Sequence, residues 1–207
     1  MSQEQDNIRI IKKRASTIQK LIKAILIIGV IFSLAILISC VVLFFASPEK
    51  FNAVKGSLEW SMNYKLTNGS SFFINIPFKI MQPLGASMFI AKNAAITSLF
   101  TLLINTSLML YGLKQIANIL NSTANDITPF IMDNVKSLKK LAYTIILYSA
   151  TVDLLSSLLF TLFVTNIVSL NLTTIHLSGV LVGGLIFVIA DIFKYGVFLQ
   201  QEFDTTL

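Results

Sequence analysis

The feature that most constrains this chain is an apolar run from Ala24 to Ala46 that contains no charged side chain. Three further stretches, at 93–113, 141–167 and 174–194, are almost as poor in charge. An apolar helix of about 20 residues crosses a hydrocarbon core about 30 Å thick. The sequence therefore predicts an all-α membrane protein, a four-transmembrane-helix bundle.

Composition agrees with a membrane protein. Charged residues make up 13% of the chain and the mean hydropathy is +0.77, whereas soluble domains carry about 25% charged residues. These values exclude a soluble globular enzyme. Cys40 is the only cysteine, so no internal disulfide can form. Residues 37–40 loosely resemble a lipoprotein box, but the apolar run continues after Cys40, which favours an uncleaved helix.

The alternation of apolar and polar segments divides the chain into eight parts. They are a basic interfacial segment (1–23), a first span (24–46), an external loop (47–92), a second span (93–113), a cytoplasmic loop (114–140), a third span (141–167), a fourth span (174–194) and a cytoplasmic tail (195–207).

The distribution of basic residues predicts the orientation. Eleven of the 16 Lys and Arg residues fall in segments 1–23, 114–140 and 195–207 or at Lys194, and the other five fall in 47–92. By the positive-inside rule, both termini are cytoplasmic in the inner membrane of a bacterium. The net charge of +6 is typical of contact with anionic lipid, and we expect no direct binding of nucleic acid.

The external loop carries a β-hairpin pattern. Apolar and polar residues alternate over 58–66, Asn68-Gly69 suits a tight turn, and 72–76 is again strand-like. Two interpretations stay open. The hairpin either binds a peptide or protein, or caps the helical bundle with Trp60 and Tyr64 at the level of the lipid headgroups.

Asp153 is the strongest functional candidate, because an ionisable residue within a span is costly and usually functional. It is either a proton-linked or ligand-linked switch, or a packing residue that faces Ser156, Ser157 or a neighbouring helix. Asp191 could in principle form an aspartyl dyad with it, but the two lie at different depths in their helices. Asp191 is more simply interpreted as the partner of Lys194.

Other features of the spans indicate packing rather than catalysis. Gly179 and Gly183 form a small-xxx-small step that lets another helix, or a second copy of the chain, approach closely. The chain has no H-E-x-x-H motif and no phosphate-binding glycine loop, and its single histidine is His176. We therefore expect no enzyme, no catalytic residue, no cofactor and no metal.

The end of the chain resembles the closing signature of a bacterial family of four-span membrane proteins of unknown function. In that family an acidic residue precedes Ile-Phe, a Gly follows three residues later, and an L-Q-x-E-x-D-x-T-apolar tail ends the protein. The matching residues here are Asp191, Ile192, Phe193, Gly196, Leu199, Gln200, Glu202, Asp204, Thr206 and Leu207. Pro129-Phe130 and Leu138-Lys139-Lys140 resemble the family's connection between its second and third helices.

Members of that family are typically encoded beside a small helix-turn-helix protein, so the resemblance implies a sensory or regulatory membrane partner of such a regulator. Its docking surface would comprise the basic N-terminal tail, Pro129, Phe130, Glu202 and Asp204. The hairpin or the bilayer would supply the input. The alternative is a self-protection, immunity or small transport-type protein that acts on an external peptide or amphiphile.

Overall fold

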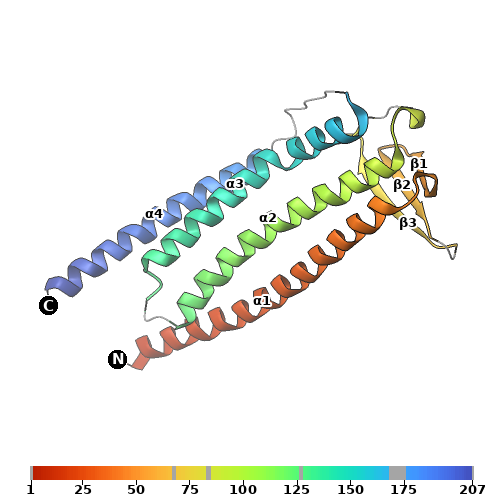
Figure 1. The fold of residues 1–207 in the computed structure, drawn as a ribbon. Coiled ribbons are helices and arrows are strands. Elements are labelled where there is room, and N and C mark those ends of the chain that lie inside the picture. The colour runs from red at the N-terminus through yellow and green to blue at the C-terminus, as the bar shows by residue number, and fades with distance from the viewer. Residues whose placement is uncertain (1, 67–68, 83–84, 126–127, 168–175, 207) are drawn as a thin grey trace. The chain divides into compact units, whose positions relative to one another are not determined.

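A computed structural model describes residues 2–66, 69–82, 85–125, 128–167 and 176–206. Within these residues it has four long helices, namely α1 (Ser2–Phe45), α2 (Ala91–Asn125), α3 (Met132–Phe160) and α4 (Leu177–Thr206) (Figure 1). All four are long and apolar enough to cross a membrane. The predicted fold class is confirmed, and the chain is a multi-pass membrane protein.

The helices extend beyond the apolar runs of the sequence. α1 continues without a break from the basic segment into the first apolar run, and it ends just before Ser47-Pro48, where proline disfavours a helical conformation in the preceding residue. α2 continues past Lys114 to Asn125, and α4 continues past Lys194 to Thr206. A charged residue marks where a helix can leave lipid, but it does not end the helix.

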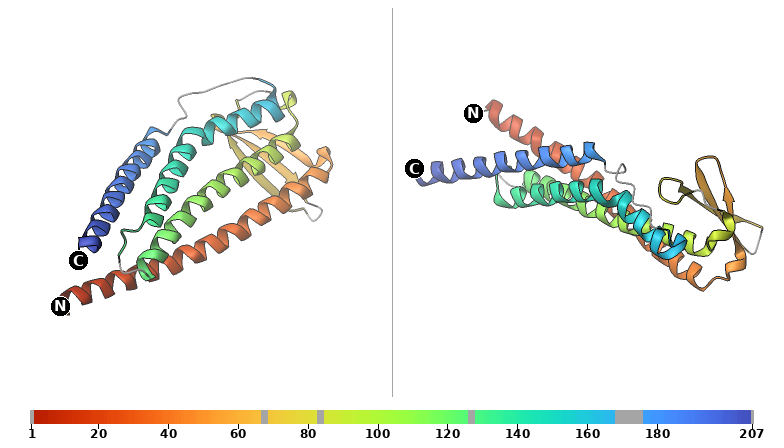
Figure 2. Two further views of the ribbon diagram at one scale, coloured as in Figure 1. Left: turned by 60° about the vertical axis from the view of Figure 1, so that its left-hand side comes forward. Right: turned by 90° about the horizontal axis from the view of Figure 1, so that it is seen from above.

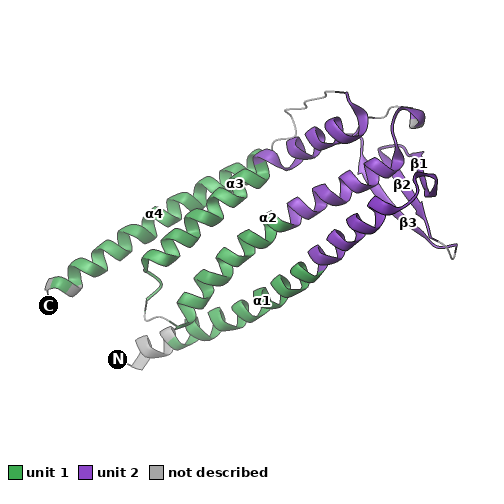
Figure 3. Cartoon of the chain, viewed as in Figure 1, with its two compact units in different colours: residues 1–31, 107–149, 176–207 green, residues 32–106, 150–175 purple. Residues whose placement is uncertain are grey.

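The chain divides into two compact units (Figure 3). Unit 1 comprises residues 1–31, 107–149 and 176–207, and unit 2 comprises residues 32–106 and 150–175. Unit 1 contains segments of all four helices, and consecutive helices contact each other within it. Gly29 of α1 faces Leu110 of α2, Gly112 of α2 faces Thr144 of α3, and α3 faces α4 at the glycines described below.

Unit 2 contains a three-stranded antiparallel sheet that lies between α1 and α2 in the chain. Its strands are β1 (Phe51–Lys55), β2 (Glu59–Lys65) and β3 (Ser71–Pro77), in the order β1-β2-β3 (Figure 2). β2 and β3 pair from Glu59↔Pro77 to Lys65↔Ser71, which confirms the predicted hairpin. Gly69 has the positive φ of +77° that a tight turn requires, while Asn68 lies outside the described residues.

The first strand was not predicted from the sequence. β1 has five residues, of which only Phe51 is buried, so it shows too little alternation to be recognised. It pairs with β2 from Phe51↔Tyr64 to Lys55↔Trp60. The Gly56 N–H donates to the Glu59 carbonyl oxygen at 2.9 Å and closes the turn between the two strands.

The core of unit 2 lies between one face of the sheet and the nearby parts of α1, α2 and α3. Trp60 is fully buried there, its ring centroid is 5.0 Å from that of Phe89, and its Nε1 donates to the Gln82 carbonyl oxygen at 3.0 Å. Trp60 therefore packs inside the core of unit 2. The other buried members include Ile36, Leu43, Phe51, Met62, Ile76, Met81, Leu99 and Phe160.

A π-helical turn follows α3 at Thr161–Thr165. Asn166 then adopts a left-handed conformation (φ 53°), and its N–H donates to the Thr161 carbonyl oxygen at 2.9 Å, which ends the helix. The start of the fourth span was predicted at Thr174, which lies outside the described residues. The described part of α4 begins at Leu177.

Candidate functional site

Asp153 forms an ion pair with a lysine from the loop that follows the sheet. Its Oδ2 is 3.0 Å from Nζ of Lys79, and the exposed fractions of the two side chains are 12% and 51%. A carboxylate with this little access to water has lost much of its hydration, and a nearby ammonium group compensates for that loss. Within unit 2 the pair joins α3 to the segment directly after β3.

The position of Lys79 follows from the end of β3. The Pro77 carbonyl oxygen accepts hydrogen bonds from the N–H groups of Ile80 (2.9 Å) and Met81 (3.1 Å), which fold the chain into a turn. Met81 is buried at 1% exposure and anchors the turn in the core of unit 2. Lys79 is therefore held on a fixed turn, although its own side chain is half exposed.

The sequence left two interpretations of Asp153, a switch or a packing residue that faces Ser156, Ser157 or a neighbouring helix, and neither identified Lys79 as its partner. The Ser156 hydroxyl donates to the Val152 carbonyl oxygen of its own helix at 2.6 Å. The external loop contains several lysines, and no pattern in the sequence distinguishes Lys79 from the others. Only the folded turn after β3 shows which lysine reaches Asp153.

Gly179 and Gly183 both lie where α4 meets α3 in unit 1. A Cβ at Gly179 would collide with the Ser149 hydroxyl, and its distance to the Ser149 Cβ would be 2.7 Å. A Cβ at Gly183 would collide with the Ile146 side chain and would lie 3.1 Å from the Ala142 carbonyl oxygen. Small residues at both positions are thus required for the close approach of the two helices.

An ion pair also joins α3 and α4. Asp191 Oδ1 is 3.0 Å from Nζ of Lys139, with exposed fractions of 68% for the aspartate and 38% for the lysine. The described partner of Asp191 is therefore on the neighbouring helix and is not Lys194, which corrects the sequence interpretation. An exposed pair of this kind contributes little to stability, typically about 0 to 1 kcal/mol.

Phe130 packs on α4 just beyond this ion pair. A Cβ at Gly196 would lie 2.6 Å from the Phe130 ring, so the ring lies directly on the glycine. The ring centroids of Phe130 and Phe193 are 5.2 Å apart. The preceding Pro129 carbonyl oxygen accepts a hydrogen bond from Asn134 Nδ2 at 2.8 Å, which holds the start of α3 against the connection. We call the contacts of Phe130 and Lys139 with α4 the inner junction.

The inner junction brings together parts of the two sequence motifs that carry the family resemblance, the 129–140 connection and the residues Asp191, Phe193 and Gly196 of the C-terminal signature. Residues 70–207 match the family described as "Protein of unknown function (DUF2975)". The chain belongs to this family. No curated protein and no solved structure matches the chain.

The DUF2975 region begins just before β3 and continues through α2, α3 and α4. It includes the Lys79–Asp153 pair and the inner junction. The N-terminal helix and the first two strands lie outside it. The residues that carry the sequence resemblance begin at Pro129, whereas the matched region begins at residue 70 and also takes in the turn that carries Lys79.

The acidic tail residues of this DUF2975 protein lie further along α4. Glu202 is exposed, and it is six residues beyond Gly196, about 9 Å along the helix axis. Asp204 is in α4 by its backbone, while its side chain is outside the described part of the structure. The inner junction therefore includes Phe130 but not Glu202.

The candidate residues interact through ion pairs and through close packing of side chains on glycines. Asp153 pairs with Lys79 in unit 2, and Asp191 pairs with Lys139 in unit 1. Among the described residues, no group of three or more His, Cys, Asp or Glu is placed to hold a metal ion. The arrangement therefore provides one ion pair between α3 and another segment in each unit.

Proposed function

We propose that this chain is a non-enzymatic regulator in the inner membrane of a bacterium, with both termini in the cytoplasm. It binds a small helix-turn-helix regulator at its cytoplasmic face and changes that binding when its external sheet or the surrounding bilayer changes. The observation that carries the proposal is the length and the exposed face of α4.

α4 is longer than a membrane span needs to be. Its 30 residues extend about 45 Å, whereas about 20 residues cross a hydrocarbon core. The last third carries the exposed apolar residues Leu199 (46%) and Phe203 (65%) on either side of Glu202. Residues three and four positions apart share one helix face. An exposed apolar and acidic helix face beyond the span is suited to dock on a partner helix.

α3 gives this docking helix a connection to an input. It contributes Asp153 to the pair with Lys79 and Lys139 to the pair with Asp191. A change that displaced the turn carrying Lys79 would act on α3 directly, because the ion pair is made with that helix. A ligand or lipid state that favours one position of the turn would then shift the population of the docking-competent state.

Reconstitution tests the proposal. The full chain is placed in lipid nanodiscs, and the affinity of a purified helix-turn-helix protein encoded beside it is measured. We expect binding by the parent, loss on deletion of residues 199–207, and at least tenfold weaker binding for Phe203→Ala with Glu202→Lys. The matched control is Lys114→Gln, at an exposed position of α2 outside the proposed docking and input residues, which should bind like the parent. Equal binding by parent and deletion variant would refute the docking role.

The alternative, self-protection against an external amphiphile, is favoured by a separate observation in unit 2. A hollow of about 300 Å³ is lined by Phe44, Phe100 and Phe163 together with Asn93 and Thr97. The ammonium group of Lys92 lies 5.9 Å from the centre of the Phe44 ring. An apolar hollow beside a cation suits an amphiphile with an acidic head. Sensitivity of a deletion strain to such amphiphiles, with unchanged transcription, would favour this function.

A further inference from the structure

A polar hollow lies between α2 and α3 in unit 1. Its volume is about 440 Å³, and nine of its ten lining residues are polar. Helix pairs in a membrane protein usually face lipid with apolar side chains, so a hollow of this composition calls for a hydrophilic occupant.

Several of its polar side chains are fixed by hydrogen bonds. Asn134 is 1% exposed and donates to the Pro129 carbonyl oxygen at 2.8 Å. Asn121 Oδ1 accepts from Gln19 of α1 at 2.6 Å and from Asn125 at 3.3 Å. Ser137 is 9% exposed. The wall is therefore a set of amide and hydroxyl groups held in place by two neighbouring helices and the connection between them.

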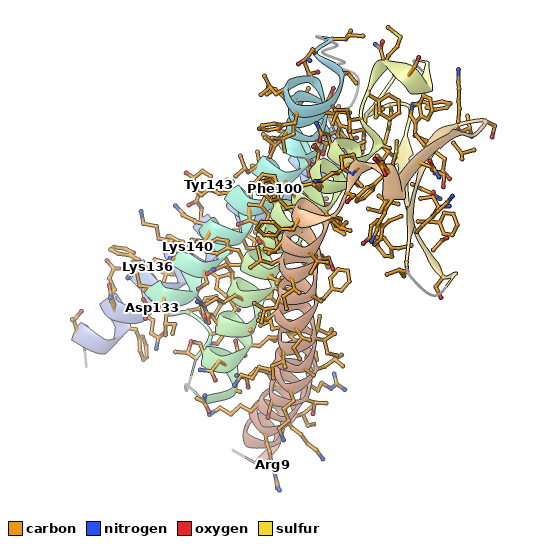
Figure 4. The ribbon with its side chains drawn as sticks, turned by 45° about the vertical axis from the view of Figure 1, so that its right-hand side comes forward. Arg9, Phe100, Asp133, Lys136, Lys140 and Tyr143 are labelled. Carbon is orange, nitrogen blue, oxygen red and sulfur yellow. The ribbon has the colours of Figure 1, made fainter. Side chains whose placement is uncertain are left out.

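The charges in the wall favour an anion. Lys136 and Lys140 line the hollow together with one acidic residue, Asp133, and all three are labelled along the first turns of α3 in Figure 4. Lys136 Nζ is 3.1 Å from Asp133 Oδ1. An incoming oxyanion would compete with Asp133 for Lys136 and would add Lys140. Ammonium and amide donors around one space match the oxygens of a phosphate group.

We propose that this hollow binds the phosphodiester headgroup of an anionic glycerophospholipid. Its location identifies the source of the phosphate. Lys140 directly precedes the apolar part of α3, and Asn118 to Asn125 follow the apolar part of α2, so the hollow lies where two spans reach the headgroups. Asp133 lowers the affinity by occupying Lys136 in the empty site. The inference does not depend on the proposed regulatory function.

The test is a lipid titration of the full chain in a neutral detergent, followed by native mass spectrometry. The probes are dioctanoyl phosphatidylglycerol, dioctanoyl phosphatidylcholine and inorganic phosphate. We expect the anionic lipid to bind most tightly. Lys136→Gln and Lys140→Gln should each weaken its binding about fivefold, the effect of one charge beside an acidic headgroup. Asp133→Asn should strengthen it, because Lys136 loses its competitor.

Lys114→Gln is the matched control, since Lys114 is in α2 but does not line the hollow. It should bind the anionic lipid like the parent. Circular dichroism spectra of all variants check that they are folded. Asp133→Asn changes only an exposed side chain, so this variant still tests the proposal if a lysine variant misfolds. Equal affinity for the two lipids, or no response to Asp133→Asn, would overturn the proposal. Displacement of the lipid by millimolar phosphate would assign the site to a free anion instead.

Discussion

Removing one member of the Lys79–Asp153 pair leaves the other charge without its partner in a partly buried place. We expect Asp153→Leu to lower the free energy of unfolding by about 1 to 2 kcal/mol. The loss is limited because the Lys79 side chain is half exposed, and the water around it screens the ion pair. Asp191→Asn, which affects a more exposed pair, should cost less than about 1 kcal/mol. Reversible unfolding of the purified protein in detergent measures both.

The Asp153 prediction has an internal check in the double variant Lys79→Gln with Asp153→Asn. If the two side chains act as a pair, the loss in the double variant is smaller than the sum of the two single losses. Strict additivity, or an Asp153→Leu variant that folds and behaves like the parent across pH, would show that the residue is merely tolerated.

The glycines of α4 give a second prediction at the level of single residues. Gly179→Ala and Gly183→Ala place a methyl group where Ser149 and Ile146 already lie, and overpacking of this kind costs about 1 to 3 kcal/mol. Gly184 has nothing within 4 Å of its would-be Cβ, so Gly184→Ala should be neutral or stabilising through helix propensity. Thermal midpoints in detergent separate the three variants. A Gly184→Ala variant that loses as much as Gly179→Ala would contradict the packing role.

Among the structural elements, the sheet of unit 2 can be followed through Trp60, the only tryptophan of the chain. Because its side chain is fully buried, its fluorescence should be blue-shifted relative to tryptophan in water and poorly quenched by iodide. Ile76→Ala removes a buried neighbour across the β2–β3 pair and should shift the emission to the red. Leu58→Ala, at a position that is 79% exposed, should leave it unchanged. Strong quenching in the parent would place Trp60 at a wet surface.

The elements also show how far the sequence could predict the fold. The four helices and the β2–β3 hairpin were predictable because their patterns are long and periodic. Helix ends such as Asn125 and Thr206 were not, since polar helical turns beyond a span carry no apolar signal. The Lys79–Asp153 pair was not predictable either, because it joins residues 74 positions apart through a turn that only the folded sheet defines.

For the whole molecule, the distribution of basic residues predicts one orientation, and the single cysteine makes that orientation testable. In a Cys40→Ser background, Ser57→Cys probes the exposed turn between β1 and β2, and Thr205→Cys probes the exposed end of α4. Eleven of the 16 basic residues are assigned to the side of the termini. Segments with such an excess of Lys and Arg stay in the cytoplasm when the chain inserts into the membrane. A membrane-impermeant maleimide should therefore label Ser57→Cys in intact cells and Thr205→Cys only after permeabilisation. Labelling in the opposite order would invert the topology and would remove the cytoplasmic docking helix on which the regulatory proposal rests.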